Sequence, residues 1–180
     1  MTRATKLRVW AQGLYEEHGP AIADLVGADE MPPVTIHVER RGPGAAWTSG
    51  TDVFLSARWF AEHPDDTGGV LHEFTHAVMQ APTYDQTTFW LIEGLADYVR
   101  DELGHDAPWT KAHYEPGKAT AGYQTTAHFL QHVERTHPRT IKRLAQALIA
   151  DTYSEDTFRQ CTGKPLAVCV SEYEQAVTGA

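Results

Sequence analysis

The chain has 180 residues, of which 42% are hydrophobic, and a formal net charge of −9 at pH 7. This length is expected to form one domain over residues 1–180 with a sizeable core. The acidic balance argues against nucleic acid as a partner, because phosphate binding needs a basic face, and no apolar run is long enough to place the chain in a membrane.

The N-terminus carries basic residues, but the apolar core of a signal peptide does not follow them. We therefore expect a cytoplasmic protein, or a secreted one whose upstream signal has been removed. Residues 7–18 have the spacing of an amphipathic helix. Gly19 and Pro20 are expected to end this helix before a second apolar stretch.

Two short strands are expected next. The run 34–38 is β-branched and alternating, and the run 51–56 is a second candidate, with a Gly- and Pro-rich loop at 41–44 between them. Ser56 is placed to cap a short helix that reaches Phe60.

Helical periodicity dominates after residue 69. One buried helix is expected from there to Pro82 and another from about 87 to 103. Residues 104–121 have no clear period and are predicted to form a loop, and three more helices are expected over 123–134, 138–150 and 165–177. These elements predict a mostly helical α+β domain with a small sheet in its N-terminal third.

The first of these helices carries the sequence His72-Glu73-Phe74-Thr75-His76. Side chains at i and i+4 leave the same face of a helix, so both imidazoles could bind one metal ion. Glu73 lies beside them, where a carboxylate can act as general base on a metal-bound water. The motif predicts a catalytic zinc site, although nitrogen and carboxylate ligands also suit other divalent ions.

A third ligand is expected from the next helix. Glu93 lies in the middle of an otherwise apolar helix, where a buried carboxylate without a partner would be costly and a metal ion would provide that partner. Asp97 follows on the same face and could accept a hydrogen bond from the outward nitrogen of a ligating histidine. The alternative for either carboxylate is an ion pair with Arg100 or another base.

Two other pairs carry weaker signals. His128 and His132 also lie at i and i+4, but no carboxylate sits suitably between them, so hydrogen-bonded or solvated histidines are expected. Cys161 and Cys169 match no zinc-binding spacing and are expected to be buried thiols, with a disulfide as the alternative.

Several stretches between Leu55 and Tyr173 match the sequence pattern of one known family. They are Leu55-Ser56-Ala57-Arg58 with Pro64 and Asp65, Val70-Leu71 before the His72–His76 motif, Gln80, residues 91–100, residues 122–130, Gly163-Lys164, and Glu172-Tyr173. Through these residues, about two-thirds of the chain resembles the basic secretory protein family, which comprises peptidases of plants and bacteria.

The resemblance implies a zincin-like fold of the gluzincin kind, with His72, His76 and Glu93 as zinc ligands. It supports the role of Asp97 as partner of a ligating histidine. It also implies that the strand over 53–56 borders the cleft, where an extended peptide could pair with its edge. Tyr123 is expected to bind the developing oxyanion; the alternative is an aromatic side chain packed at a helix start.

Residues and resemblance together predict a zinc-dependent metallopeptidase, in which Glu73 takes a proton from the attacking water and passes it to the leaving amine. A second possibility is a dedicated non-peptide small-molecule substrate, hydrolysed or cyclised in a biosynthetic pathway. A third is a non-catalytic zinc-binding module, although a structural zinc site has no use for Glu73.

Overall fold

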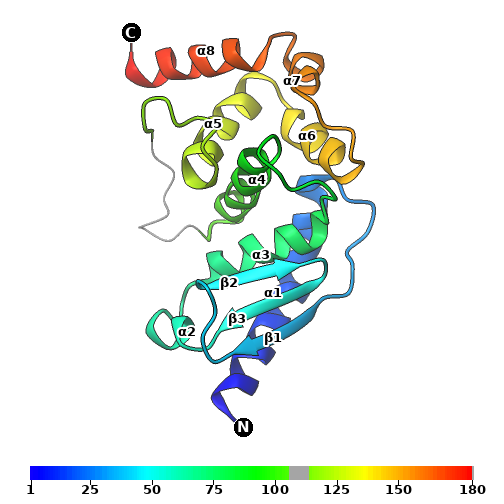
Figure 1. Cartoon of the computed structure of the whole chain (residues 1–180), viewed down its shortest axis with the longest axis vertical. Helices are drawn as coiled ribbons and strands as arrows, with labels where there is room; N and C mark the ends of the chain where they lie inside the picture. Colours follow the sequence, from blue (N-terminus) through cyan, green and yellow to red (C-terminus); the bar gives the residue numbers. More distant parts are fainter. Residues whose placement is uncertain (106–113, 180) are drawn as a thin grey trace.

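The structure is a computed structural model that describes residues 1–105 and 114–179. Its elements, in chain order, are α1 (Arg3–Val26), β1 (Thr35–Glu39), β2 (Ala46–Ser49), β3 (Asp52–Ser56), α2 (Trp59–Glu62), α3 (Thr67–Met79), α4 (Phe89–Glu102), α5 (Tyr123–Thr136), α6 (Thr140–Ile149), α7 (Glu155–Thr162) and α8 (Leu166–Thr178). The predicted α+β class with a small N-terminal sheet is confirmed (Figure 1). Part of the loop predicted over 104–121 lies outside the described residues.

Helix α3 occupies the middle of the molecule. It packs against α1 and the sheet on one side and against α4 on the other, while α5, α6 and α8 lie beyond α4 (Figure 1). Its apolar side chains are accordingly buried, as are most residues of α4. The residues of the His72–His76 motif are therefore held between the sheet and the helices that follow α3.

The sheet has the strand order β1-β3-β2, with β1 parallel and β2 antiparallel to β3. Strand β3 is central and buries Val53 and Leu55. The expectation that a peptide could pair with the edge of residues 53–56 is wrong, because both edges of β3 are already paired. The edge strand beside α3 is β2, which was not predicted because its four residues are too short to show an alternating pattern.

Helix α1 continues through Pro20, so the prediction that Gly19 and Pro20 end it is wrong. Proline removes one backbone hydrogen bond from a helix interior. Beyond it, Ile22 and Val26 are fully buried in the core, and this packing outweighs the local penalty. The helix ends instead at Gly27, which adopts a left-handed conformation.

The remaining boundaries follow local signals. Helix α3 begins after Asp66, whose carboxylate accepts a hydrogen bond from the Gly69 N–H at 2.9 Å, and ends at Gln80, before the predicted Pro82. The Ser56 hydroxyl accepts from the Trp59 N–H at the start of α2, although the N-cap position is Arg58 and the helix extends to Glu62 rather than Phe60. Helix α7 was missed because it is mostly polar and buries a single apolar side chain, that of Phe158.

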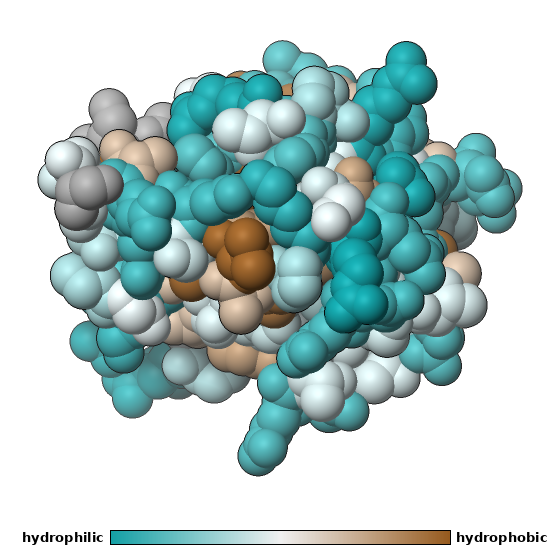
Figure 2. Space-filling model, turned by 90° about the horizontal axis from the view of Figure 1, so that it is seen from above, coloured by the Kyte–Doolittle hydropathy of each residue, from teal (hydrophilic) through white to brown (hydrophobic). Residues whose placement is uncertain are grey.

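None of the described helices is long and apolar enough to cross a membrane. Seen from the end at which α8 lies, the surface is mostly hydrophilic, with one small hydrophobic patch (Figure 2). Cys161 and Cys169 are free thiols; Cys169 is buried, whereas Cys161 is only partly so.

Candidate metal centre

Three side chains predicted as ligands meet between α3 and α4. The His72 Nε2 atom lies 3.0 Å from His76 Nε2 and 3.2 Å from Glu93 Oε2, and His76 Nε2 lies 3.6 Å from Glu93 Oε1. His72 and Glu93 are 8% and 5% exposed, so both are almost enclosed by protein. Two adjacent helices thus bring together a set of nitrogen and oxygen donors from residues about 20 positions apart.

These separations fit a tetrahedral metal ion. Ligand atoms at about 2.0–2.1 Å from such an ion lie about 3.3 Å from one another. The three donors all lie within 4.8 Å of one another. The distances from His72 Nε2 to His76 Nε2 and to Glu93 Oε2, 3.0 and 3.2 Å, are close to the expected 3.3 Å. Three protein ligands also leave the fourth position open for water or substrate, as in catalytic zinc sites.

A buried chain of charges orients His72. Its Nδ1 lies 2.7 Å from Asp97 Oδ1, so the ring can donate a proton there and point Nε2 at the other ligands. Arg100 reaches the same carboxylate oxygen at 3.5 Å and the carboxylate of Asp66 at 3.8 Å. Gly68 leaves room for this contact, because a Cβ atom there would lie 2.4 Å from Arg100 Nη2.

The hydrogen bonds within the centre favour the protonated form of His72 and the ionised form of Glu93. Burial lowers the pKa of His72, but hydrogen bonds to Asp97 and Glu93 outweigh it and raise the pKa to about 10. Burial raises the pKa of Glu93, but hydrogen bonds with His72 and His76 outweigh this effect and hold the pKa well below its usual range. A metal ion that bound there near neutral pH would therefore displace a proton from His72.

Glu73 extends from α3 toward strand β2, where it meets a partner that the sequence did not reveal. The Thr48 hydroxyl lies 2.8 Å from Glu73 Oε2 and 3.1 Å from the Glu73 carbonyl oxygen, and it can donate to either. This contact ties the edge strand to the helix and fixes the Glu73 carboxylate. No signal pointed to Thr48, because the strand that carries it was itself not predicted.

Two tyrosines face the centre. Tyr123 is 47% exposed, and its ring is nearly parallel to that of His72 at a centroid distance of 6.2 Å. The hydroxyl of Tyr84, on the α3–α4 connection, donates to Glu93 Oε1 at 2.6 Å; this residue was not predicted. Burial raises the pKa of both hydroxyls, and Glu93 adds to the effect, so both stay protonated at neutral pH.

These groups border a cleft of about 700 Å³. Its remaining lining is mostly apolar or neutral, and consists of Ala46, Trp47 and Gly50 on the sheet side and Met79, Gln80, Ala81 and Ile92 on the helix side. The carboxylates that line it are Glu73 and Glu93. The chemistry of the site is therefore concentrated at the metal centre, in an otherwise uncharged groove.

The second histidine pair has other partners. The Nδ1 atom of His128 lies 2.8 Å from the Tyr173 hydroxyl, and the ring of His132 packs against the same tyrosine. The contact of His128 fits the expectation of hydrogen-bonded or solvated histidines, whereas the packing of His132 against a tyrosine was not predicted. Among the described residues, the cluster able to hold a metal ion is that of His72, His76 and Glu93.

Comparison with known proteins gives one match. The model of a family described as peptidase of plants and bacteria matches residues 5–173, and so contains every residue of the centre and cleft. No curated protein and no solved structure matches the chain.

Proposed function

The chain belongs to the peptidases of plants and bacteria, and we propose that it is a zinc-dependent metallopeptidase whose centre is formed by His72, His76 and Glu93. The observation that carries this proposal is the spacing of their donor atoms, which fits a tetrahedral ion with one open position. Two histidines one turn apart on a helix and a glutamate on the next helix also support a zincin-like fold of the gluzincin kind.

His72, His76 and Glu93 would hold the metal ion, with Asp97 keeping the His72 ring in place through its Nδ1–H. When bound, zinc lowers the pKa of a water ligand toward 7 and polarises the scissile carbonyl. Glu73 accepts a proton from the attacking water and later gives it to the leaving amine. Thr48 keeps the Glu73 carboxylate in one orientation during both transfers.

Tyr123 and Tyr84 both line the cleft and carry neutral hydroxyls that can donate to a developing oxyanion. We assign Tyr123 the role that the sequence predicted and add Tyr84 as a second donor. The single O–H of Tyr84 donates to Glu93 in the structure, so it would have to leave that carboxylate before it could donate to the oxyanion.

A peptide suits this cleft better than a compact small molecule. Strand β2 lines the cleft and leaves one edge of the sheet unpaired among the described residues. An extended chain can add to such an edge through main-chain hydrogen bonds. The cleft would then hold the scissile bond beside this strand, next to the carboxylate of Glu73 and the proposed metal ligands.

The test is cleavage of a diverse peptide mixture by the zinc-loaded protein, analysed by mass spectrometry. Glu73→Gln is the matched control, because it keeps the size of the side chain and removes the proton acceptor. Cleavage by the wild type alone is expected, with unchanged zinc content in the variant. Cleavage by Glu73→Gln would reject this mechanism, and a zinc-loaded wild type that cuts no peptide would reject the peptidase assignment in favour of a dedicated small-molecule substrate.

A further inference from the structure

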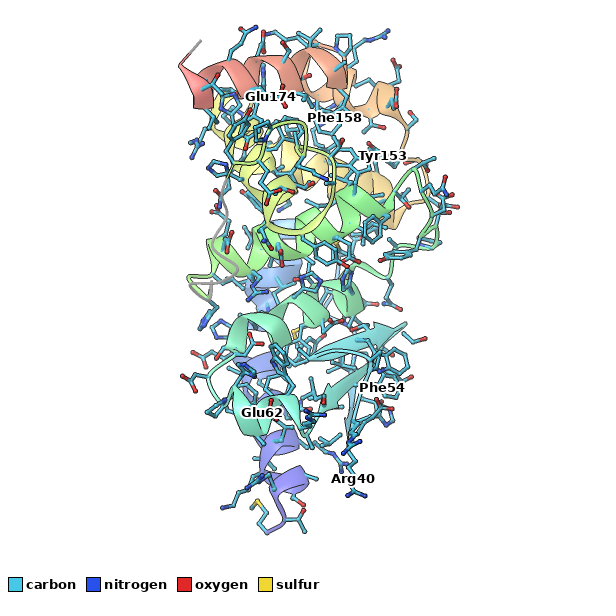
Figure 3. All side chains as sticks on the ribbon, turned by 60° about the vertical axis from the view of Figure 1, so that its left-hand side comes forward. Arg40, Phe54, Glu62, Tyr153, Phe158 and Glu174 are labelled. Atoms are coloured by element: carbon cyan, nitrogen blue, oxygen red, sulfur yellow. The ribbon has the colours of Figure 1, made fainter. Side chains whose placement is uncertain are left out.

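Three planar side chains stack in a row across the outer face of the sheet. The ring centroids of Trp47 and Phe54 lie 3.8 Å apart with an interplanar angle of 3°, and those of Phe54 and His37 lie 4.5 Å apart at 14°. Each comes from a different strand, at directly paired positions. Figure 3 shows Phe54 on the face of the sheet turned away from the helices. The row ends at Trp47, on the edge strand β2.

Polar contacts fix both ends of the row. The indole Nε1–H of Trp47 donates to Glu39 Oε2 at 3.3 Å, and His37 Nε2 lies 2.6 Å from Asp52 Oδ1. Stacking and hydrogen bonding together leave the Trp47 ring little freedom to rotate. Trp47 is also one of the residues that line the cleft.

The backbone pattern of β2 shows how a peptide would meet this ring. The Ser56 N–H donates to the Ala45 carbonyl at 2.9 Å, which makes these residues a hydrogen-bonded pair of the antiparallel ladder. Because such pairs alternate, Trp47 turns its backbone groups toward β3, whereas Ala46 and Thr48 turn theirs toward the free edge.

An antiparallel peptide strand would bond to the backbones of Ala46 and Thr48 and place its intervening residue opposite Trp47. Cross-strand partners share a face of the sheet, so that residue would lie on the outer face beside the indole. It would also form a non-hydrogen-bonded pair, in which side chains approach most closely. Its neighbour, opposite Thr48, would lie nearest to Glu73.

We propose that Trp47 is a specificity-determining residue that selects an aromatic substrate side chain at this single position. The substrate ring stacks on Trp47 and extends the row of His37, Phe54 and Trp47 by one member. This inference rests on the proposed peptidase function. It predicts a preference for peptides with an aromatic residue next to the one that pairs with Thr48.

The test compares peptides of one length in which Phe or Leu is placed at each position in turn. Binding is measured by fluorescence anisotropy on zinc-loaded Glu73→Gln protein, so no turnover is needed. At one position, the peptide with Phe is expected to bind about three- to tenfold more tightly than the peptide with Leu, which is the range typical of an aromatic pair. Trp47→Phe should keep this preference and Trp47→Leu should lose it.

A second measurement uses a peptide with 4-nitrophenylalanine at the same position, which quenches the fluorescence of a nearby indole. Quenching should occur in Glu73→Gln protein and be lost when Trp47→Phe is added. Equal binding of Phe and Leu, a preference that survives Trp47→Leu, or quenching unchanged by Trp47→Phe would overturn the inference. Cleavage without an aromatic preference rejects this subsite alone, whereas aromatic-selective binding without any cleavage rejects the peptidase function alone.

Discussion

At the scale of single residues, Glu73 differs from the other carboxylates of the centre in the partner that it has. Glu93 and Asp97 contact histidines, whereas Glu73 contacts the neutral hydroxyl of Thr48. A hydroxyl can fix a carboxylate in position without competing for the proton that a general base must take up. In the proposed mechanism, Thr48 is therefore a positioning residue, which acts on the reaction through Glu73.

Replacing Thr48 by valine removes this hydrogen bond and preserves the shape of the side chain. Hydrogen bonds to charged groups contribute about 1.5–3 kcal/mol, so kcat should fall by about ten- to a hundredfold while KM stays near the wild-type value. Steady-state kinetics on one peptide would measure both constants. Thr48→Ser should recover most of the lost rate; a rise in KM with kcat unchanged would instead place Thr48 in substrate binding.

In the proposed centre, Asp97 acts on the metal ion through His72, which it contacts at 2.7 Å. Asp97→Asn keeps the volume but removes the charge that holds the ring in its ligating orientation. Zinc affinity should fall by about 10- to 100-fold, as is typical when such a partner is lost. Competition with a chelator would measure the dissociation constant, and Thr48→Val provides a control with wild-type affinity. Equal affinities for Asp97→Asn and wild type would show that Asp97 has only a structural role.

The predicted ligands came from local patterns. Helical spacing alone places His72 and His76 on one face, and a carboxylate in an apolar helix identified Glu93. Thr48 lies on a strand too short to show a period, and Tyr84 lies on the α3–α4 connection, which has none. Contacts of this kind depend on how strands and loops pack, which a single sequence does not specify.

At the scale of elements, the position of α4 depends on close packing against α5. A Cβ atom at Gly94 would lie 2.1 Å from Thr126 Cγ2, so only glycine allows this approach of the two helices. Gly94 directly follows Glu93, the third ligand of the proposed centre. The spacing of α4 and α5 therefore also determines where the third ligand lies.

Gly94→Ala should lower the free energy of unfolding by about 1–3 kcal/mol, because overpacking outweighs the gain in helix propensity. Gly13→Ala is the matched control within helix α1, where an added Cβ meets nothing within 4 Å and should stabilise by about 0.5–1 kcal/mol. Denaturant unfolding of metal-free protein measures both. A Gly94→Ala protein as stable as the wild type would show that the interface adapts.

The elements that sequence analysis found are those with a strong period of their own. Helices α3 and α4 bury apolar residues along much of their length, which makes their pattern readable. The course of α1 through Pro20 and the existence of β2 and α7 depend on tertiary contacts. Local propensity is outweighed where such contacts bury side chains like Ile22 and Phe158.

At the scale of the whole molecule, buried tyrosines connect distant segments. The Tyr15 hydroxyl of α1 donates to the Pro32 carbonyl, and the Tyr173 hydroxyl of α8 contacts His128. Burial raises the pKa of both phenols to about 12 and that of Tyr98 well above its usual range. The folded state therefore retains phenolic protons that the unfolded chain loses near pH 10.

Because these folded-state pKa values are raised, their contribution to stability is complete below about pH 10 and is lost as the pH rises toward 12. The free energy of unfolding should consequently fall between about pH 9.5 and 11.5. Denaturant titrations at several pH values would measure the slope, and Tyr15→Phe should make it shallower. Stability that stays constant over this range would contradict the burial of these hydroxyls.

Stepwise return of zinc to chelator-treated protein tests most directly whether His72, His76 and Glu93 form a catalytic metal centre. Bound zinc, determined by elemental mass spectrometry, and peptide cleavage are followed on the same samples, with His76→Ala treated in parallel. Cleavage should rise in proportion to bound zinc, level off near about one ion per chain, and be absent in His76→Ala together with the zinc. Cleavage by zinc-free protein, or stoichiometric zinc retained by His76→Ala, would contradict the assignment.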